Sequence, residues 1–114
     1  MQRPIYVDYM TTEDFIENSH NFSKPDATWP PALQALWHAE RGEWDEAHRL
    51  CQIGNSKDGA WVHANLHREE GDLSNAAFWY SRADKPVQDG DITTERREIL
   101  ADVLKRLSGL LDKE

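Results

Sequence analysis

The amino-acid sequence predicts an all-α fold: two stacked antiparallel helix hairpins with an irregular N-terminal arm and a C-terminal amphipathic cap helix. Three observations carry this prediction. Apolar residues recur at helical spacing from residue 31 onward, glycine or proline punctuates the helical segments, and the pattern around Gly42 recurs around Gly71. A chain of 114 residues has the size of one domain, so residues 1–114 are expected to share a single core.

Residues 1–30 are expected to form the arm, which contains one short helix. Four of the five prolines fall in the first 31 residues, and proline lacks the amide proton that long regular elements require. Thr11 and Asp14 have the spacing of a capping box ahead of Phe15, which predicts a helix over residues 12–19. The remainder of the arm is predicted to be extended or irregular.

Two helix hairpins are predicted within residues 31–86. Proline is tolerated in the first turn of a helix, and glycine after a helix adopts the left-handed conformation that closes a tight turn. The four expected helices run from residue 31 to before Gly42, from Glu43 to Ile53, from Ala60 to Glu70, and from Ser74 to Ala83. Each hairpin alone leaves an apolar face bare, so the two hairpins are expected to stack.

The last helix, within residues 92–112, has the clearest amphipathic pattern and is expected from about Thr94 to Leu111. Its apolar face holds Ile99, Leu100, Val103, Leu104, Leu107, Leu110 and Leu111. This helix is expected to cap the stack. As an alternative, its face from Leu100 to Leu111 meets another protein.

An internal repeat with an offset of 29 residues links the two hairpins. It aligns Ala35 with Ala64, His38 with His67, Gly42 with Gly71, and Ala47 with Ala76. The second unit resembles the tetratricopeptide repeat in Ala64, Gly71-Asp72, Ala76, Tyr80 and Pro86. The resemblance covers about residues 31–86, is best over residues 60–86, and implies a helical-repeat adaptor that binds a protein or peptide. The stretch from Ala60 to Asp72 also resembles short bacterial proteins, which implies no function.

Charge and cysteine content narrow the classes of partner and compartment. The formal net charge of −8 is spread along the chain, so it repels nucleic-acid backbones and anionic membrane surfaces. A single cysteine forms no internal disulfide, and no apolar segment has the length of a membrane span, which favours a cytoplasmic protein. The expected partner is a protein or peptide, and a second copy of the chain is included in that class.

The tetratricopeptide resemblance places four residues of the second hairpin on a peptide-binding groove: Trp61, Asn65, Arg68 and Glu69. Trp61 is expected to be a flat apolar anchor, Asn65 to bind main chain, and Arg68 to hold an acidic group. This interpretation describes a non-enzymatic adaptor without a cofactor. No phosphate-binding or nucleophile-elbow motif occurs in the sequence.

A metal site is the alternative function. At about 100° per residue, His63, His67 and Glu70 lie on one helical stripe. Two imidazoles with a carboxylate are a known ligand set for zinc or iron. His38, at the matching position of the first repeat unit, is a candidate fourth ligand. The competing structural interpretation is that these imidazoles pack between helices as hydrogen-bonded core residues.

Three apolar residues on the inner face of the first hairpin, Leu33, Leu36 and Ala39, require a cover. The N-terminal arm is expected to supply it through Ile5, Tyr6, Val7, Phe15 and Phe22, and a second subunit is the alternative. Cys51 and His48 form a thiol–imidazole pair by spacing only, without the local sequence signature of a nucleophile.

Overall fold

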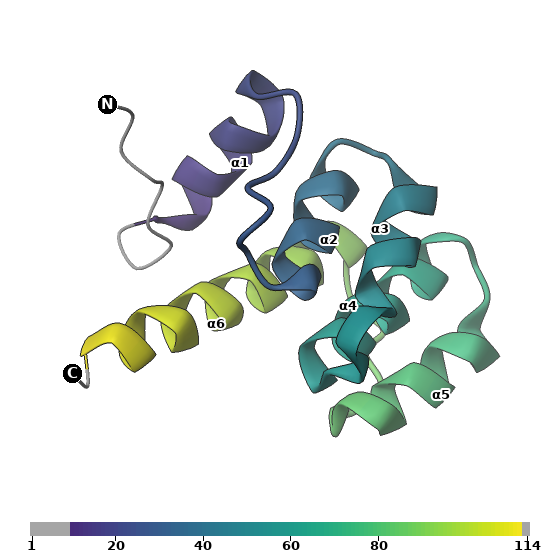
Figure 1. The fold of residues 1–114 in the computed structure, drawn as a ribbon. Helices are drawn as coiled ribbons and strands as arrows, with labels where there is room; N and C mark the ends of the chain where they lie inside the picture. Colours follow the sequence, from purple (N-terminus) through teal and green to yellow (C-terminus); the bar gives the residue numbers. More distant parts are fainter. Residues whose placement is uncertain (1–9, 113–114) are drawn as a thin grey trace, which may run out of the picture.

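The computed structural model describes residues 10–112, which form six α-helices and one short 3₁₀ helix (Figure 1). The helices are α1 (Thr12–Asn21), α2 (Pro31–Glu40), α3 (Trp44–Cys51), α4 (Lys57–Glu69), α5 (Leu73–Ala83) and α6 (Ile92–Asp112), and the 3₁₀ helix η2 spans Ile53–Asn55. No strand occurs among the described residues, so the all-α prediction is confirmed.

Side-chain caps mark where several helices begin, α1 and α4 among them. The hydroxyl of Thr11 accepts a hydrogen bond from the Asp14 N–H, and the Asp14 carboxylate accepts one from the Thr11 N–H. These two bonds complete the predicted capping box of α1. Ser56 caps α4 by accepting from a first-turn N–H. This cap starts α4 at Lys57 rather than at the predicted Ala60.

Glycine turns join the helices within each hairpin. Gly42 follows α2 with a φ of 76°, and Gly71 follows α4 with a φ of 85°. Only glycine adopts this left-handed conformation without a steric penalty. Helix α2 packs on α3, α4 packs on α5, and α3 contacts α4 between the hairpins. The two predicted hairpins therefore form and touch.

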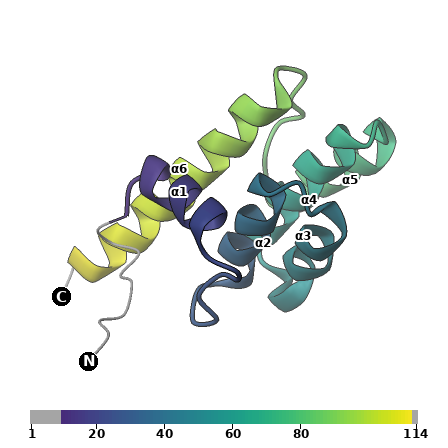
Figure 2. The same cartoon turned by 90° about the horizontal axis from the view of Figure 1, so that it is seen from above.

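The long helix α6 crosses the hairpins instead of extending the stack. It contacts α4, α2 and α1. Figure 2 shows α1 and α6 side by side at one end of the molecule and α5 at the other. Because α6 lies here, it covers the face of α4 on which the peptide groove was predicted.

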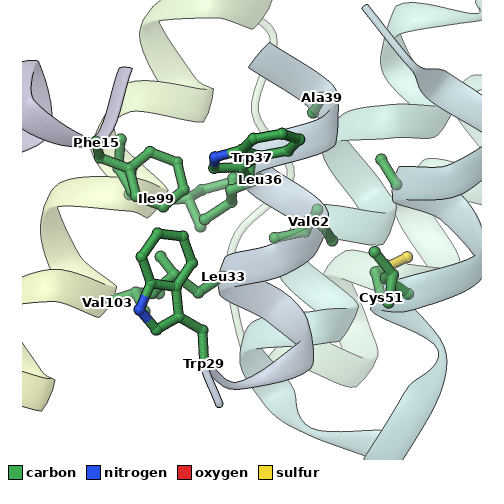
Figure 3. Packing of buried hydrophobic residues seen from close by; sticks show 14 of the residues in the cluster. Phe15, Trp29, Leu33, Leu36, Trp37, Ala39, Cys51, Val62, Ile99 and Val103 are labelled. Atoms are coloured by element: carbon green, nitrogen blue, oxygen red, sulfur yellow. The ribbon is translucent and has the colours of Figure 1, made fainter. Parts of the chain in front are cut away.

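The main core brings together buried side chains of α1, α2, α3, α4 and α6 (Figure 3). Its fully buried side chains include Phe15, Leu33, Leu36, Trp37 and Ile99. The Trp37 indole Nε1–H donates to Asn18 Oδ1 at 2.8 Å, so the buried ring has its polar partner. Burying one large apolar side chain contributes about 1.5–3 kcal/mol, and this core anchors α6 against the first hairpin.

The cover over the inner face of the first hairpin comes from α6 and from Phe15 of α1. The expected contribution of Phe22 is wrong: its side chain is 51% exposed, because the chain leaves α1 in an extended conformation at this residue. Ile5, Tyr6 and Val7, also assigned to the cover, lie outside the described residues.

The face of α6 from Leu100 to Leu104 is buried in this core, so that part of the face is not available to another protein. Leu110 and Leu111 belong to the turns of α6 whose side chains are not described. Within residues 10–112, none of the helices combines the length and apolar character needed to cross a membrane.

Candidate metal centre

Helix α6 occupies the face of α4 where a peptide groove was predicted. Asn65 and Arg68 are 1% and 9% exposed, and both donate to the buried Glu95 carboxylate of α6, at 2.9 and 2.8 Å. The Tyr80 hydroxyl and the Trp61 indole N–H also donate to Glu95. The expectation that Asn65 and Arg68 line an open groove is wrong, because α6 buries both side chains and supplies the acidic group itself. Trp61 is half-buried.

The remaining polar atoms of this Glu95 network are also paired. The Asn65 amide donates to the Ile92 carbonyl at 3.1 Å and accepts from Arg96 Nε at 2.9 Å. The exposed Glu69, the fourth predicted groove residue, accepts from Arg96 Nη2 at 3.0 Å. Burial, together with the Glu95 carboxylate, raises the pKa of Tyr80, which keeps the phenol protonated as a donor. The network fastens α6 to α4 and α5.

A second polar cluster lies between α3 and α4 and consists of His48, His63 and His67. His63 and His67 stand one turn apart on α4, and His48 reaches them from α3. The Nε2 atoms of His48 and His63 are 2.9 Å apart. One ligand nitrogen from each of the three rings lies within 4.8 Å of the other two. Three imidazoles from two hairpins therefore converge on one point.

Helix packing explains why His48 reaches α4. The Trp44 indole N–H donates to the Leu66 carbonyl at 2.9 Å and fixes α3 against α4. His48 follows Trp44 by one helical turn, so it lies on the same side of α3. The Trp44 ring stacks on His48 with centroids 4.7 Å apart. On the other flank, Trp79 stacks on His63 at 3.9 Å. The two indoles limit rotation of the two rings.

Glu70 orients His67 from outside the cluster. Its Oε1 lies 2.7 Å from His67 Nδ1. A carboxylate can only accept, so neutral His67 carries its hydrogen on Nδ1 and presents the Nε2 lone pair. Glu70 was predicted as a ligand, but it does not belong to the group of three converging rings. It belongs with His67 and Asp72 to a separate group, in which Asp72 caps α5.

Two of the three rings, His48 and His63, favour the uncharged form. Burial, followed by the nearby His48 and His67, lowers the pKa of His63 to about 3. Burial, followed by His67, also lowers the pKa of His48. Neutral imidazole is the form that binds a metal ion. His63 Nδ1 is buried with no hydrogen-bond partner among the described residues, so the cluster is not saturated by internal hydrogen bonds.

His38, the predicted fourth ligand, lies elsewhere. Its Nδ1 is 2.7 Å from the Glu43 carboxylate, and its ring packs edge-on against Trp37. The third imidazole is instead His48, which the sequence interpretation paired only with Cys51. The position of His48 one turn after Trp44, beside the apolar stripe of α3, is a signal that could have placed it near the core.

Cys51 is not a nucleophile candidate. The buried thiol donates to the His48 carbonyl at 3.2 Å. Burial raises the pKa of Cys51 to about 12, so the reactive thiolate is not populated near neutral pH. The thiol thus contacts the backbone of His48 and not its imidazole.

Comparisons with known proteins found no similar protein: no family model, no curated sequence and no solved structure matches this chain. The tetratricopeptide likeness therefore stays a prediction from the sequence.

Proposed function

We propose that this protein binds one transition-metal ion, zinc in the first instance, through the imidazoles of His48, His63 and His67. The observation that supports the proposal is the convergence of three ring nitrogens from two hairpins, with His67 already oriented by Glu70. A metal-bound histidine commonly donates its other ring N–H to a carboxylate in this way.

The donor set indicates which ions the centre prefers. All three donors are imidazole nitrogens, which suit zinc, copper and nickel, whereas magnesium and calcium require oxygen donors. Zinc binds imidazole nitrogen at about 2.0–2.1 Å, which in a tetrahedron separates the donors by about 3.4 Å. The 2.9 Å between His48 and His63 Nε2 needs only a small opening to reach that spacing.

The ion would link the two hairpins. His48 belongs to the first hairpin, and the other two ligands belong to the second. Zinc binding is therefore expected to stabilise the packing of α3 on α4 and the folded chain as a whole. The predicted peptide-binding function has no comparable support, because α6 covers Asn65 and Arg68, two of the residues assigned to its groove.

Calorimetric titration with zinc chloride of protein prepared without an affinity tag tests this proposal. The wild type is expected to bind about one equivalent, and His48→Gln to lose at least about 100-fold in affinity. His38→Gln is the matched control and is expected to bind like the wild type. Equal zinc affinity of the wild type and His48→Gln, with both folded by circular dichroism, would contradict the proposal.

A further inference from the structure

We propose that this centre keeps one coordination position free, so that the ion exchanges a water molecule for a small anion from solution. The inference rests on the proposed zinc site and goes beyond it, because it assigns the centre to the ligand-binding or catalytic class. Structural zinc sites have four protein ligands, whereas catalytic sites have three and an open position.

The described chain supplies three ligands and no fourth. Within residues 10–112, no carboxylate, thiol or further imidazole joins His48, His63 and His67 in one group. The Cys51 thiol donates to the backbone carbonyl of His48 and does not belong to this group. The Glu70 carboxylate faces Nδ1 of His67, on the opposite side of the ring from Nε2. A four-coordinate ion therefore completes its shell with a molecule from solution.

Burial of the three rings is uneven, and this provides access. His63 and His67 are almost fully buried, at 3% and 5% exposure, whereas His48 is only half-buried. The flanking Trp44 and Trp79 are also half-buried. Of the three rings, His48 is therefore the most accessible to solvent. The free position is expected on the side of the cluster where His48 lies.

Charge indicates the class of the exchangeable ligand. Three neutral imidazoles leave the double positive charge of the ion uncompensated, unlike a thiolate site, in which ligands cancel it. Such a centre favours anions, and it lowers the pKa of a bound water to about 7. A small oxygen- or nitrogen-donor anion, hydroxide included, is the ligand that fits. Metal-bound hydroxide is also the nucleophile that hydrolytic zinc enzymes use.

Cobalt substitution followed by azide titration tests the open position without requiring an activity. Cobalt(II) in an imidazole site absorbs visible light, and its spectrum responds to exchange of a ligand. We expect the spectrum of the full-length cobalt protein to change with azide and to saturate as one site. His38→Gln should respond like the wild type, whereas His48→Gln should form no such cobalt species.

The outcomes separate the two proposals. A cobalt spectrum that azide leaves unchanged would show a closed centre, and it would overturn the open position while the metal site stands. Absence of any protein-bound cobalt spectrum in the wild type, together with no zinc binding, would overturn both proposals. A saturable azide response that persists in His48→Gln would also contradict the assignment of the site.

Discussion

Two buried polar clusters flank α4, and they differ in how completely their hydrogen bonds are satisfied. In the Glu95 network, donors from Asn65, Arg68, Tyr80 and Trp61 meet one carboxylate. In the histidine cluster, the three rings share one contact within hydrogen-bond distance, and a buried nitrogen of His63 has no partner among the described residues.

The difference separates a structural cluster from a candidate site. A satisfied buried network fixes one arrangement of helices, and breaking it is costly. The unpartnered atom of His63 is Nδ1, whereas the atom that approaches His48 is Nε2. In the metal-free chain one of the two Nε2 atoms donates to the other, and a metal ion would take the place of that shared hydrogen. The account therefore assigns structure to the Glu95 side of α4 and function to the histidine side.

The largest expected effect comes from breaking the Glu95 network. Glu95→Gln keeps the shape of the side chain but removes the charge that pairs with buried Arg68. An uncompensated buried charge costs about 3–5 kcal/mol, so Glu95→Gln should lower the free energy of unfolding by about that amount. Urea denaturation of the variant and the wild type measures this difference. Glu98→Gln is the matched control on an exposed turn of α6 and should change stability by less than about 0.5 kcal/mol. Equal effects of the two substitutions would refute the structural role.

Addition and removal of metal should produce the next largest effect on stability. The effect should require an intact histidine cluster. Free zinc at about 100 times its dissociation constant stabilises a folded protein by about 2.7 kcal/mol. The wild type should therefore melt several degrees higher with zinc, and a chelator should reverse the shift. The His48→Gln protein should show neither change. A zinc-dependent shift of the same size in that variant would place the ion elsewhere.

Acid should destabilise the metal-free protein through His63. Its pKa is lowered from 6.5 to about 3 on folding, so below pH 6.5 the unfolded chain binds a proton that the folded chain does not. The contribution is complete above pH 7 and is lost as the pH falls. Between pH 7 and pH 5 this histidine alone should account for about 2 kcal/mol.

Urea denaturation at each pH, compared with His63→Gln, measures that contribution. The lowered pKa of His48 acts in the same direction, so the free energy of unfolding of His63→Gln should still fall as the pH falls. Its slope against pH should be shallower than that of the wild type. The nearby His67 ring is also one of the causes that lower the pKa of His63. Identical pH slopes for the wild type and His63→Gln between pH 7 and pH 5 would contradict burial of a neutral imidazole.

The smallest effect should follow from His48→Gln in the absence of metal. His48 is half-buried, and its ring is replaced by an amide that can still reach His63. The unfolding free energy at pH 7 should change by less than about 1 kcal/mol. A loss of several kcal/mol would mean that His48 is a core residue, as the competing structural interpretation of the histidines requires.

Local sequence signals located the helices, but not the contacts between them. The Thr11 capping box and the turns at Gly42 and Gly71 were predictable, because each depends on neighbouring residues. The partner of Arg68 was not, because Glu95 lies 27 residues away on a helix whose crossing direction is set by core packing.

The residues of the candidate metal centre could also be predicted only in part from the sequence. One helical stripe correctly grouped His63 with His67, since both stand on α4. The repeat alignment then selected His38, which the structure places beside Glu43. The choice of His48 depends on how α3 packs on α4, which is a tertiary property that no spacing within one segment encodes.

The most direct test of the metal centre is nitrogen NMR of the five histidines during a zinc titration. The account predicts that the Nε2 resonances of His48, His63 and His67 shift together and saturate at about one equivalent. The resonances of His20 and His38 should stay in place. Shifts spread over all five rings, or an unchanged spectrum of His48 and His63, would contradict a three-histidine centre between α3 and α4.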